Sequence, residues 1–324
     1  MTIVPSRPAV AIVVVNWNGW QDTIECLQSL LQLSYGSYRI VVVDNGSTDG
    51  SLLELTAWAR QSEQELQVAR RDAPPTRLPR ILVVETGTNL GWAGGTNVGV
   101  RLGLEMGAHL FWLLNNDTIV DAQSLDYLVE AVQNDTTVGI VGSKIVYYDH
   151  PRILWSAGGG IRWWRGGATY HIGLDRPDGE EFNRRRQVEY VTGCSLLVHA
   201  SLVQSVGFLP EHYHMYFEDP EWCVRARRAG WKVIYEPGSV VHHKVARSTS
   251  RRPALVDYYV TRNRLRFVLR HRPALLPIAL MDIVKTALSY WRAGNQQALS
   301  MTLRGMLDFF RGRQGPLPEV LVPR

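Results

Sequence analysis

The stretch that decides the fold is FWLLNNDTIVD, residues 111–121, in which a run of large apolar residues stops on three polar ones. Its first four residues are apolar without alternation, which is typical of a strand buried on both faces of a parallel sheet. Asn115, Asn116 and Asp117 follow at once. The stretch therefore predicts a central strand whose carboxyl end carries two amides and a carboxylate.

Three similar strands precede this one, with helices between them. The other continuous apolar runs are VAIVVVN (10–16), RIVVVD (39–44) and ILVVE (81–85). Apolar spacing near 3.6 residues predicts helices over residues 21–34, 51–66, 95–107 and 122–134. The charged, proline-rich segment 67–80 is expected to be a surface loop. Four strand–helix units in a row predict an α/β fold, with a mostly parallel sheet flanked by helices on both faces.

Polar residues stand at the carboxyl end of each predicted strand. The four ends read NWNG (16–19), DNGS (44–47), ETG (85–87) and NND (115–117). Ligands of open α/β sheets bind outside these ends. A carboxylate there suits Mg²⁺ or Mn²⁺, which takes oxygen ligands and shares substrate phosphates. Asp117 is the candidate ligand, whereas Asp121 could equally be the N-cap of the following helix.

A second acidic cluster lies in MYFEDPEWCVRARRAGWKV, residues 215–233. Helix capping explains part of it, because Asp219 suits the N-cap and Pro220 the first helical position. One cap does not need two acids, however. Adjacent carboxylates such as Glu218 and Asp219 can raise one pKa and keep a general base ready for a hydroxyl proton.

A histidine pair follows a later apolar strand, at His242 and His243 in SVVHHKVARS. Such a pair is more often structural or exposed to solvent than ligating. A cation held by Asp117 nevertheless needs further ligands, and a histidine one strand after the acidic helix is a reasonable source.

The glycine-rich turns DNGSTDGS (44–51) and NLGWAGGTNVG (89–99) precede predicted helices, whose N-termini favour phosphate. Neither turn matches the glycine patterns of dinucleotide-binding proteins or P-loop NTPases. The three cysteines, at positions 26, 194 and 223, are too few and scattered for a disulfide framework or a zinc site. The small number of cysteines fits a reducing cytosol, so a cytoplasmic location is expected. The first apolar run is too short for a signal peptide and predicts a core strand.

The charge of the chain is unevenly distributed. The net charge is +5, but residues 244–324 hold 15 Lys/Arg against 4 Asp/Glu, which leaves 20 against 26 in residues 1–243. The pattern is helical from residue 254 to about 312, and no run reaches the roughly 18 uninterrupted apolar residues of a membrane span. Three explanations of this basic region stay open: a bundle with a solvated basic face, an interfacial helix on an anionic membrane, and a nucleic-acid footprint. Its central arginines are Arg262, Arg264, Arg266, Arg270 and Arg272.

In this order, the motifs resemble those of family 2 glycosyltransferases with the GT-A fold, in the rhamnosyltransferase-like branch. The resemblance covers about residues 9–270. It rests on VVVNWNG, VVVDNGSTDGS, NLGWAGGTNVG, LLNNDT, VTGCSLLVH, YFEDPEWCVRARRAGWKVIYEP, VVHH and YYVTRNRLRF. It implies a Rossmann-like, nucleotide-diphospho-sugar transferase domain over residues 1–250 and a basic, amphipathic helical region over residues 251–324.

The resemblance also implies residue roles at the strand ends. Asp44 would accept a hydrogen bond from the N3–H of uracil or thymine, and Asn89, Gly91 and Asn97 would line the ribose and diphosphate. The implied donor-binding set is Asn16, Asn18, Asp44, Asn45, Asn89, Gly91, Asn97, Asn115 and Asn116.

The metal-binding and catalytic roles follow in the same way. Residues 115–117 stand where the family carries Asp-x-Asp, so Asp117 would bind Mn²⁺ or Mg²⁺, while an asparagine at position 115 removes one negative charge. His243, six residues after Pro237, would be the second ligand in preference to His242. Asp219 would be the catalytic base. The implied neighbours of the acceptor and base are Glu218, Gly193, Cys194 and Glu221.

The implied activity is inverting transfer of a sugar to a hydroxyl of a surface polysaccharide or lipid-linked glycan. Rhamnose from dTDP-rhamnose is the first candidate donor, and other dTDP- or UDP-hexoses follow. The protein is expected in the cytoplasm or on the inner face of the plasma membrane, where residues 251–324 would contact anionic lipid; a nucleic-acid partner is not expected. Nucleotidyltransfer is disfavoured because NWNGWQD contains no Lys or Arg. The non-enzyme alternative is an inactive glycosyltransferase-like module that binds nucleotide sugar or glycan.

Overall fold

The structure is a computed structural model that describes residues 7–77, 79–245 and 253–317. Over these residues the strands are β1 (Val10–Asn16), β2 (Tyr38–Asp44), β3 (Leu66–Arg70), β4 (Ile81–Glu85), β5 (Leu110–Asn115), β6 (Thr118–Val120), β7 (Val138–Tyr147), β8 (Leu154–Ser156), β9 (Gly159–Arg162), β10 (Ala168–His171), β11 (Arg186–Gln187), β12 (Ser195–His199) and β13 (Lys232–His243). The α-helices are α1 (Trp20–Leu30), α2 (Ser51–Gln61), α3 (Gly91–Glu105), α4 (Ser124–Asn134), α5 (Ala200–Val206), α6 (Glu218–Arg228), α7 (Pro253–His271), α8 (Leu276–Arg292) and α9 (Gln296–Phe310).

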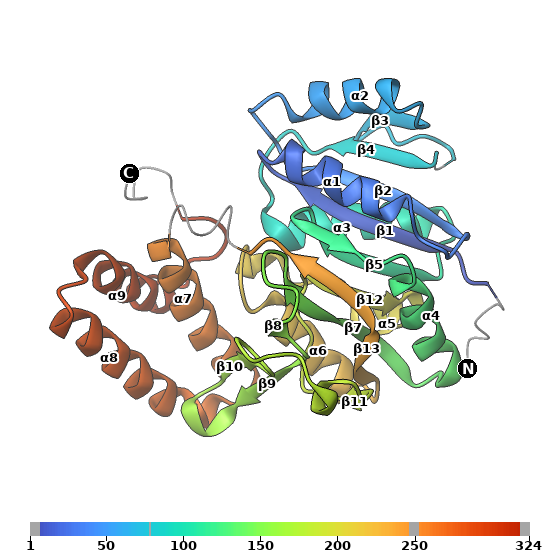
Figure 1. The fold of residues 1–324 in the computed structure, drawn as a ribbon. Helices are drawn as coiled ribbons and strands as arrows, with labels where there is room; N and C mark the ends of the chain where they lie inside the picture. Colours follow the sequence, from blue (N-terminus) through green and yellow to red (C-terminus); the bar gives the residue numbers. More distant parts are fainter. Residues whose placement is uncertain (1–6, 78, 246–252, 318–324) are drawn as a thin grey trace.

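One mixed sheet forms the centre of the molecule (Figure 1). Its main order is β11-β13-β7-β12-β5-β1-β2-β4-β3. The strands from β5 to β3 along this order run parallel to one another, and β7 runs parallel to β13. Strand β12 lies antiparallel between β5 and β7. The predicted α/β fold with a mostly parallel sheet and C-terminal helices is confirmed.

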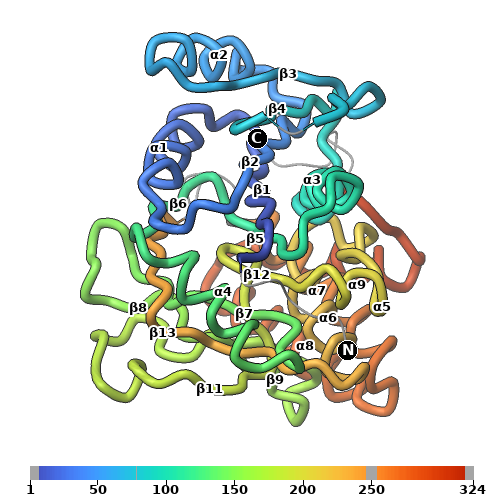
Figure 2. The backbone as a smooth tube through the Cα atoms, turned by 90° about the vertical axis from the view of Figure 1, so that its right-hand side faces the viewer, coloured from blue at the N-terminus to red at the C-terminus, as the bar shows by residue number. Residues whose placement is uncertain are grey.

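The central strands are buried on both faces, as their continuous apolar sequences predict. In β1, Ile12 and Val14 pack in one cluster with residues of α1, α2 and α4. Val13 points to the opposite cluster, which includes residues of α3, α5 and α6. Figure 2 shows α1 and α3 on opposite sides of β1 and β2. Truncating one such fully buried aliphatic side chain to alanine would cost about 2–5 kcal/mol.

The register of the sheet brings the polar strand ends together. Asn16 of β1 is paired with Asp44 of β2, and Asp44 is paired with Glu85 of β4. On the other side of β1, Val15 is paired with Asn115 of β5. Because these strands are parallel, their carboxyl ends form one continuous edge, where ligands of such sheets bind.

Two expected segments differ from the structure. Residues 66–70, expected as the end of a helix and the start of a loop, form the edge strand β3, whose Val68 pairs with Val83 of β4. This pairing is a tertiary contact and leaves no local sequence signal. Helix α3 begins at Gly91, so most of the glycine-rich turn is helical. Its glycines allow close packing: a Cβ on Gly99 would lie 2.4 Å from the side chain of Val13.

The C-terminal helices pack onto the α/β domain and share its core. Phe267 of α7 stacks on Trp163 with ring centroids 5.3 Å apart and also contacts Phe217. Leu265 and Phe267 are fully buried in the cluster that contains α3 and α6. The expected boundary at residue 250 lies outside the described residues.

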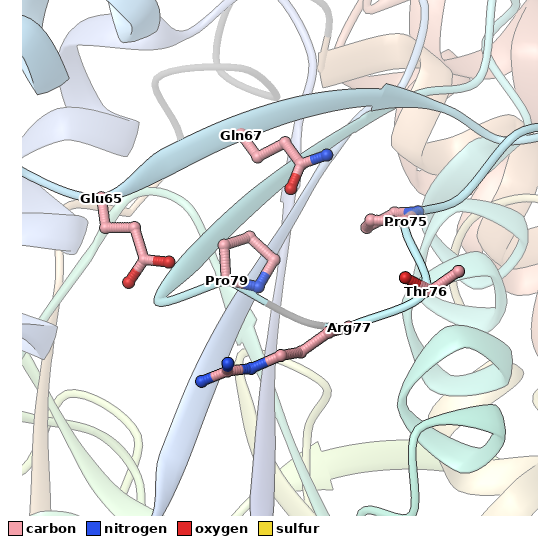
Figure 3. A pocket seen from close by; sticks show the side chains of 6 residues that line it. All are labelled: Glu65, Gln67, Pro75, Thr76, Arg77 and Pro79. Atoms are coloured by element: carbon pink, nitrogen blue, oxygen red, sulfur yellow. The ribbon is translucent and has the colours of Figure 1, made fainter.

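Two surface pockets lie away from the edge formed by the carboxyl ends of the strands. One, of about 360 Å³, is lined by residues at the start of β3 and in the loop before β4, among them Glu65, Gln67 and Arg77 (Figure 3). A second is lined by Gln28 and Trp58, among others, near the ends of α1 and α2. Both lie near the amino ends of β3 and β4, so neither coincides with the expected ligand edge.

Candidate active site

Asp117 and His243 lie side by side at the carboxyl end of β5. Asp117 stands in the turn between β5 and β6, and His243 ends β13, which pairs with β6. His243 Nε2 is 3.2 Å from Asp117 Oδ1. Burial would raise the pKa of Asp117, but the hydrogen bond and charge of His243 lower it below its ordinary value. Burial would lower the pKa of His243, but Cys194 and Asp117 raise it.

This pair fits a divalent cation that has few protein ligands. For metal–ligand distances of about 2.1 Å, two adjacent ligands of an octahedral cation lie about 3 Å apart, close to the separation observed. His243 Nδ1 is buried without a hydrogen-bond partner. Within residues 7–77, 79–245 and 253–317, no cluster of three or more Asp, Glu, His or Cys suits a metal. A bound cation would therefore take its remaining ligands from water and from a substrate diphosphate.

Glu218 and Asp219 open helix α6, and neither acts as its N-cap. The N-cap position is Phe217, in a left-handed conformation, so both acids lie in the first turn. Burial raises the pKa of Asp219, although backbone hydrogen bonds oppose it. Burial and the neighbouring Asp219 raise the pKa of Glu218, whose Oε2 is buried without a hydrogen-bond partner. Two carboxyl groups whose pKa values lie above the usual range suit proton transfer near neutral pH.

The turn at residues 192–194 connects the acidic pair to Asp117 and His243. The Gly193 N–H donates a 3.0 Å hydrogen bond to Asp219 Oδ2, and the Cys194 carbonyl accepts one of 3.1 Å from the N–H of Asn115. The Cys194 thiol contacts His243, and burial raises the pKa of this thiol. Gly193 is required by space, because a Cβ there would lie 2.2 Å from the ring of Trp92. The turn therefore positions the candidate base and metal ligands relative to each other.

Three bulky residues before the acidic pair have positive φ. His214, Tyr216 and Phe217 have φ values of 67°, 64° and 75°. Each such conformation costs on the order of 1–3 kcal/mol and persists only where the surroundings hold it. Asn263 of α7 supplies that support, since its side-chain amide lies 2.7–3.0 Å from the carbonyl oxygens of Tyr213, Met215 and Tyr216.

Asn16, Asp44 and Ser47 form a buried network at the ends of β1 and β2. Asn16 Nδ2 donates to Asp44 Oδ1 at 2.8 Å and to Ser47 Oγ at 3.1 Å. The Ser47 hydroxyl donates to Asp44 Oδ1 at 2.5 Å. Asn18 continues the network, because its backbone N–H donates to Ser47 Oγ at 3.0 Å and its side chain accepts from the N–H of Thr48 at 2.7 Å. The structure thus brings three predicted donor-binding residues together.

Asn45, Asn89 and Gly91 lie on the adjacent turn. Asn45 is buried and donates to the carbonyl of Gly91 and to Asn89 Oδ1, so it fixes the start of α3. Gly91 has φ +75°, and a Cβ there would lie 2.5 Å from the carbonyl oxygen of His214. The close approach of Gly91 to the strained segment therefore explains this glycine without a ligand.

Some of the remaining expected residues take structural roles. Asn97 is buried and exchanges hydrogen bonds with the backbone of Leu209, so its amide is not directed to the ligand edge. Glu221, expected beside the acceptor, is buried and paired with Arg225 and Arg270. His242 contacts Asp121, which is not the N-cap of α4.

The two asparagines before Asp117 make different contacts, Asn116 through its side chain and Asn115 through its backbone. Asn116 donates to Gly19 O and to Thr23 Oγ1, which ties this turn to α1. Asn115 is half-buried at the end of β5, and its backbone contacts the 192–194 turn.

Residues outside the predicted set of site residues also contact the site. The Thr192 side chain contacts Asp219, and the Trp155 ring lies edge-on to His243 with centroids 4.7 Å apart. Asn263 belongs to the quoted motif YYVTRNRLRF, to which no role was assigned. That motif was the one signal in the sequence that could have pointed to it.

Comparisons with known proteins identify the family of this chain. The sequence model of glycosyl transferase family 2 matches residues 11–180, and that of glycosyl transferase family group 2 matches residues 110–294. The chain is 27% identical over 263 residues to an N-acetylglucosaminyl-diphospho-decaprenol L-rhamnosyltransferase of Mycobacterium tuberculosis, covering 75% of this chain and 78% of the relative. It is 26% identical over 221 residues to the low-salt glycan biosynthesis hexosyltransferase Agl10 of Haloferax volcanii, covering 68% and 62%.

Solved structures share the fold at low sequence identity. The mannosyltransferase PcManGT from Pyrobaculum calidifontis, in complex with GDP-Man and Mn²⁺, matches with a TM-score of 0.56 and 16% identity over 95% of this chain and 89% of its own. GalNAc-T7 with UDP, GalNAc and Mn²⁺ matches with a TM-score of 0.61 and 15% identity over 81% of this chain. The match spans about half of GalNAc-T7, 48% of its chain. Because the first family match alone covers more than half of the sequence, this chain belongs to glycosyltransferase family 2, with rhamnosyltransferase-like relatives.

Proposed function

We propose that the protein is an inverting, divalent-metal-dependent glycosyltransferase that transfers a sugar, rhamnose first among the candidates, from a dTDP- or UDP-linked donor. The proposed acceptor is a hydroxyl of a lipid-linked or surface glycan. The observation that carries the proposal is the 192–194 turn, which joins Asp219 to the pair Asp117 and His243 at the carboxyl edge of the sheet. The M. tuberculosis relative, whose name specifies a rhamnosyl group and a decaprenol-linked substrate, supports the choice of sugar and acceptor.

The proposed chemistry is a single displacement at the anomeric carbon. Asp219, oriented by the Gly193 N–H, takes the proton of the acceptor hydroxyl. The acceptor oxygen forms the new bond to the anomeric carbon while the bond from that carbon to the diphosphate oxygen breaks. The electron pair of the broken bond leaves with the diphosphate. One displacement from the face opposite the leaving group inverts the configuration.

The two ends of the donor would be held by different residues. Asp44, fixed by Asn16 and Ser47, would accept from the N3–H of uracil or thymine. Asp117 and His243 would hold Mn²⁺ or Mg²⁺, which when bound supplies positive charge to the departing diphosphate. With asparagine at position 115, the protein contributes one carboxylate from this turn, so the diphosphate itself supplies much of the negative charge around the cation.

The decisive experiment compares the protein with Asp219→Asn. Donors dTDP-rhamnose and UDP-hexoses are incubated with Mn²⁺ and a polyprenyl-diphosphate-linked N-acetylglucosamine acceptor. We expect the unmodified protein to form an inverted glycoside. Asp219→Asn should lose about 10²–10⁴-fold in transfer rate, the range for a general base, while donor still raises its melting temperature. Asp72→Asn, at an exposed carboxylate, is the matched control.

Two results would contradict the proposal. Full activity of Asp219→Asn would remove the assigned base. If no donor releases nucleoside diphosphate but donors still raise the melting temperature, the protein is a binding module without transferase activity.

A further inference from the structure

Helices α8 and α9 expose apolar residues along one stripe each. They form the outermost part of the molecule, on the side away from the central sheet (Figure 1). The exposed apolar residues are Met281, Val284, Leu288 and Trp291 on α8 and Leu303, Leu307 and Phe310 on α9. Their spacings of three or four residues place each set on one face of its helix. We refer to these seven residues as the apolar face. Its most exposed members are Trp291, at 67%, and Phe310, at 63%.

The opposite faces of the two helices hold them in the protein. Ala279, Ile283 and Ala287 of α8 are buried, as are Ala298 and Met301 of α9. Both helices pack against α7, which is itself part of the central core. The apolar face thus consists of the two stripes, one on each of two contacting helices, that the fold leaves uncovered. Exposed apolar residues gathered in this way, unlike single scattered ones, mark an interaction site.

Helix α8 is suited to lie on a bilayer and not to cross one. By length and composition alone, residues Pro273–Arg292 could span a membrane, with a mean hydropathy of 1.3, but only 17% of that window is buried in the protein. Asp282 lies within it and pairs with Arg264 at 2.9 Å and with Arg165 at 2.9 Å. If α8 crossed a bilayer, Asp282 would be separated from Arg264 and Arg165 and both ion pairs would break. If α8 lies on the surface of the bilayer, both ion pairs are kept.

The charge around the apolar face favours an anionic partner. The exposed basic residues of this region are Arg270, Arg272, Lys285, Arg292, Arg311 and Arg313. Over residues 254–317 the acidic residues are Asp257, Asp282 and Asp308, and none of them is exposed. Asp308 is buried beside Arg304, Arg311 and Arg313, and Asp257 accepts a hydrogen bond from Tyr290. The net surface charge here is therefore positive.

The five central arginines of the basic region differ in exposure, and Arg266 is half-buried and binds the carbonyl of Arg313. Arg262 and Arg264 of α7 are buried and bind backbone carbonyls of the domain, so they are structural. Arg270 and Arg272 are exposed. The basic contribution to a surface therefore comes from the end of α7 and from α8 and α9.

We propose that the apolar face of α8 and α9 docks the protein on an anionic lipid bilayer. Exposed Trp, Leu and Phe would enter the boundary between headgroups and acyl chains, and the flanking Lys and Arg would contact anionic headgroups. A second copy of this chain fits less well, because two such faces would place like charges against each other. The proposal deepens the proposed function, in which the acceptor is lipid-linked, and it positions the domain beside that acceptor.

The test is sedimentation of the full-length protein with vesicles, without any measurement of catalysis. Vesicles of phosphatidylglycerol and phosphatidylcholine are compared with vesicles of phosphatidylcholine alone. We expect strong binding to the anionic vesicles, weakened by salt. A triple variant should lower the partition coefficient of the protein onto vesicles at least 10-fold; it combines Met281→Gln, Leu288→Gln and Leu307→Gln. Lys285→Glu with Arg292→Glu should lower it on anionic vesicles only.

Matched controls separate the face from general surface effects. Leu53→Gln with Leu174→Gln changes exposed apolar residues elsewhere, and Arg60→Glu with Arg71→Glu changes exposed charges elsewhere. These variants should bind as the unmodified protein does. All variants change exposed side chains, and an unchanged melting temperature verifies their fold.

Three outcomes would overturn the proposal. The first is that the unmodified protein does not bind anionic vesicles. The second is that the apolar-face variants bind these vesicles as strongly as the unmodified protein does. The third is that light scattering shows a dimer which the apolar-face variants dissociate, while no vesicles are bound. The last outcome would assign the face to a second copy. A protein that binds vesicles but transfers no sugar would refute the proposed function and leave this inference standing.

Discussion

The side-chain amide of Asn263 donates a 3.0 Å hydrogen bond to the carbonyl oxygen of Tyr216, three residues before the candidate base Asp219. The same amide also lies 2.7 Å from the carbonyl oxygen of Met215. Asn263 belongs to α7, whose Leu265 and Phe267 are buried in the same core as residues of α3 and α6. This contact makes the C-terminal region part of the scaffold of the candidate active site, because it supports a segment in which Tyr216 and Phe217 have positive φ.

Replacing Asn263 should therefore reduce catalysis more than donor binding. In Asn263→Ala the carbonyl oxygens of Met215 and Tyr216 lose this donor, while that of Tyr213 keeps Arg262. The loss should cost about 1–3 kcal/mol of unfolding free energy. Misplacement of the base by about 1 Å should lower kcat on the order of 10²-fold, with little change in the dissociation constant of the donor. Isosteric Asn263→Asp, which cannot donate, should behave similarly. Asn134→Ala, on the exposed surface of α4, is the control. If the kcat of Asn263→Ala equals that of this control, Asn263 does not position the base.

Activity should rise with pH through the raised pKa of Asp219. The base must be ionised to accept a proton, and burial raises its pKa above the ordinary carboxyl range. The acidic limb of kcat/KM should therefore lie well above pH 4, the value of an unperturbed aspartate. A pH profile measured with saturating Mn²⁺ gives this limb directly. A limb near pH 4 would mean that another group, or an unperturbed Asp219, controls the step.

Glu218→Gln should stabilise the fold increasingly as pH rises. The folded protein holds a proton on Glu218 that the unfolded chain loses near pH 4, because burial and Asp219 raise the pKa in the folded state. The stability of the unmodified protein therefore falls with pH across this window, until Glu218 ionises in the folded state too. The difference in melting temperature, variant minus unmodified, should grow from pH 5 to pH 8. A constant difference would show that Glu218 has an ordinary pKa.

The two histidines offer a matched test of metal binding. His243→Ala should weaken Mn²⁺ binding, which is measured by the shift in melting temperature with Mn²⁺ and UDP. The affinity should fall by at least the roughly 10–100-fold that the loss of an outer-shell partner costs. His242→Ala should leave it unchanged, because His242 contacts Asp121 instead. Likewise, Asp117→Asn should weaken binding and Asp121→Asn should not. Equal effects of the two histidine variants would exclude His243 as the specific ligand.

Gly193→Ala tests the turn that connects the two parts of the site. The added Cβ would lie 2.2 Å from the Trp92 ring, so the turn or the ring must move. We expect a loss of about 1–3 kcal/mol in unfolding free energy and a lower kcat, since the Gly193 N–H holds Asp219. Gly36→Ala is the control, because a Cβ there meets no atom within 4 Å. A stable and fully active Gly193→Ala would show that the turn tolerates displacement.

The sequence by itself determined the sheet and its polar edge. Continuous apolar strands such as residues 110–115 have to be buried on both faces, and parallel strands have to present their carboxyl ends together. Asp117, Asp44 and Asp219 were therefore predicted as site residues from local patterns and the family motifs. The edge strand at residues 66–70 was missed, because its pairing with β4 is a tertiary contact.

Only the tertiary structure decided which of these polar residues face the site. Asn97 and Glu221 stand in the right motifs, yet each is bound to a partner from a segment distant in the sequence: Asn97 to Leu209, and Glu221 to Arg270. Asn263 shows the converse, because its role depends on a carbonyl 47 residues away in the chain. Periodicity fixes the face of a helix on which a side chain lies, but the hydrogen-bond partner of a buried polar group is chosen by packing.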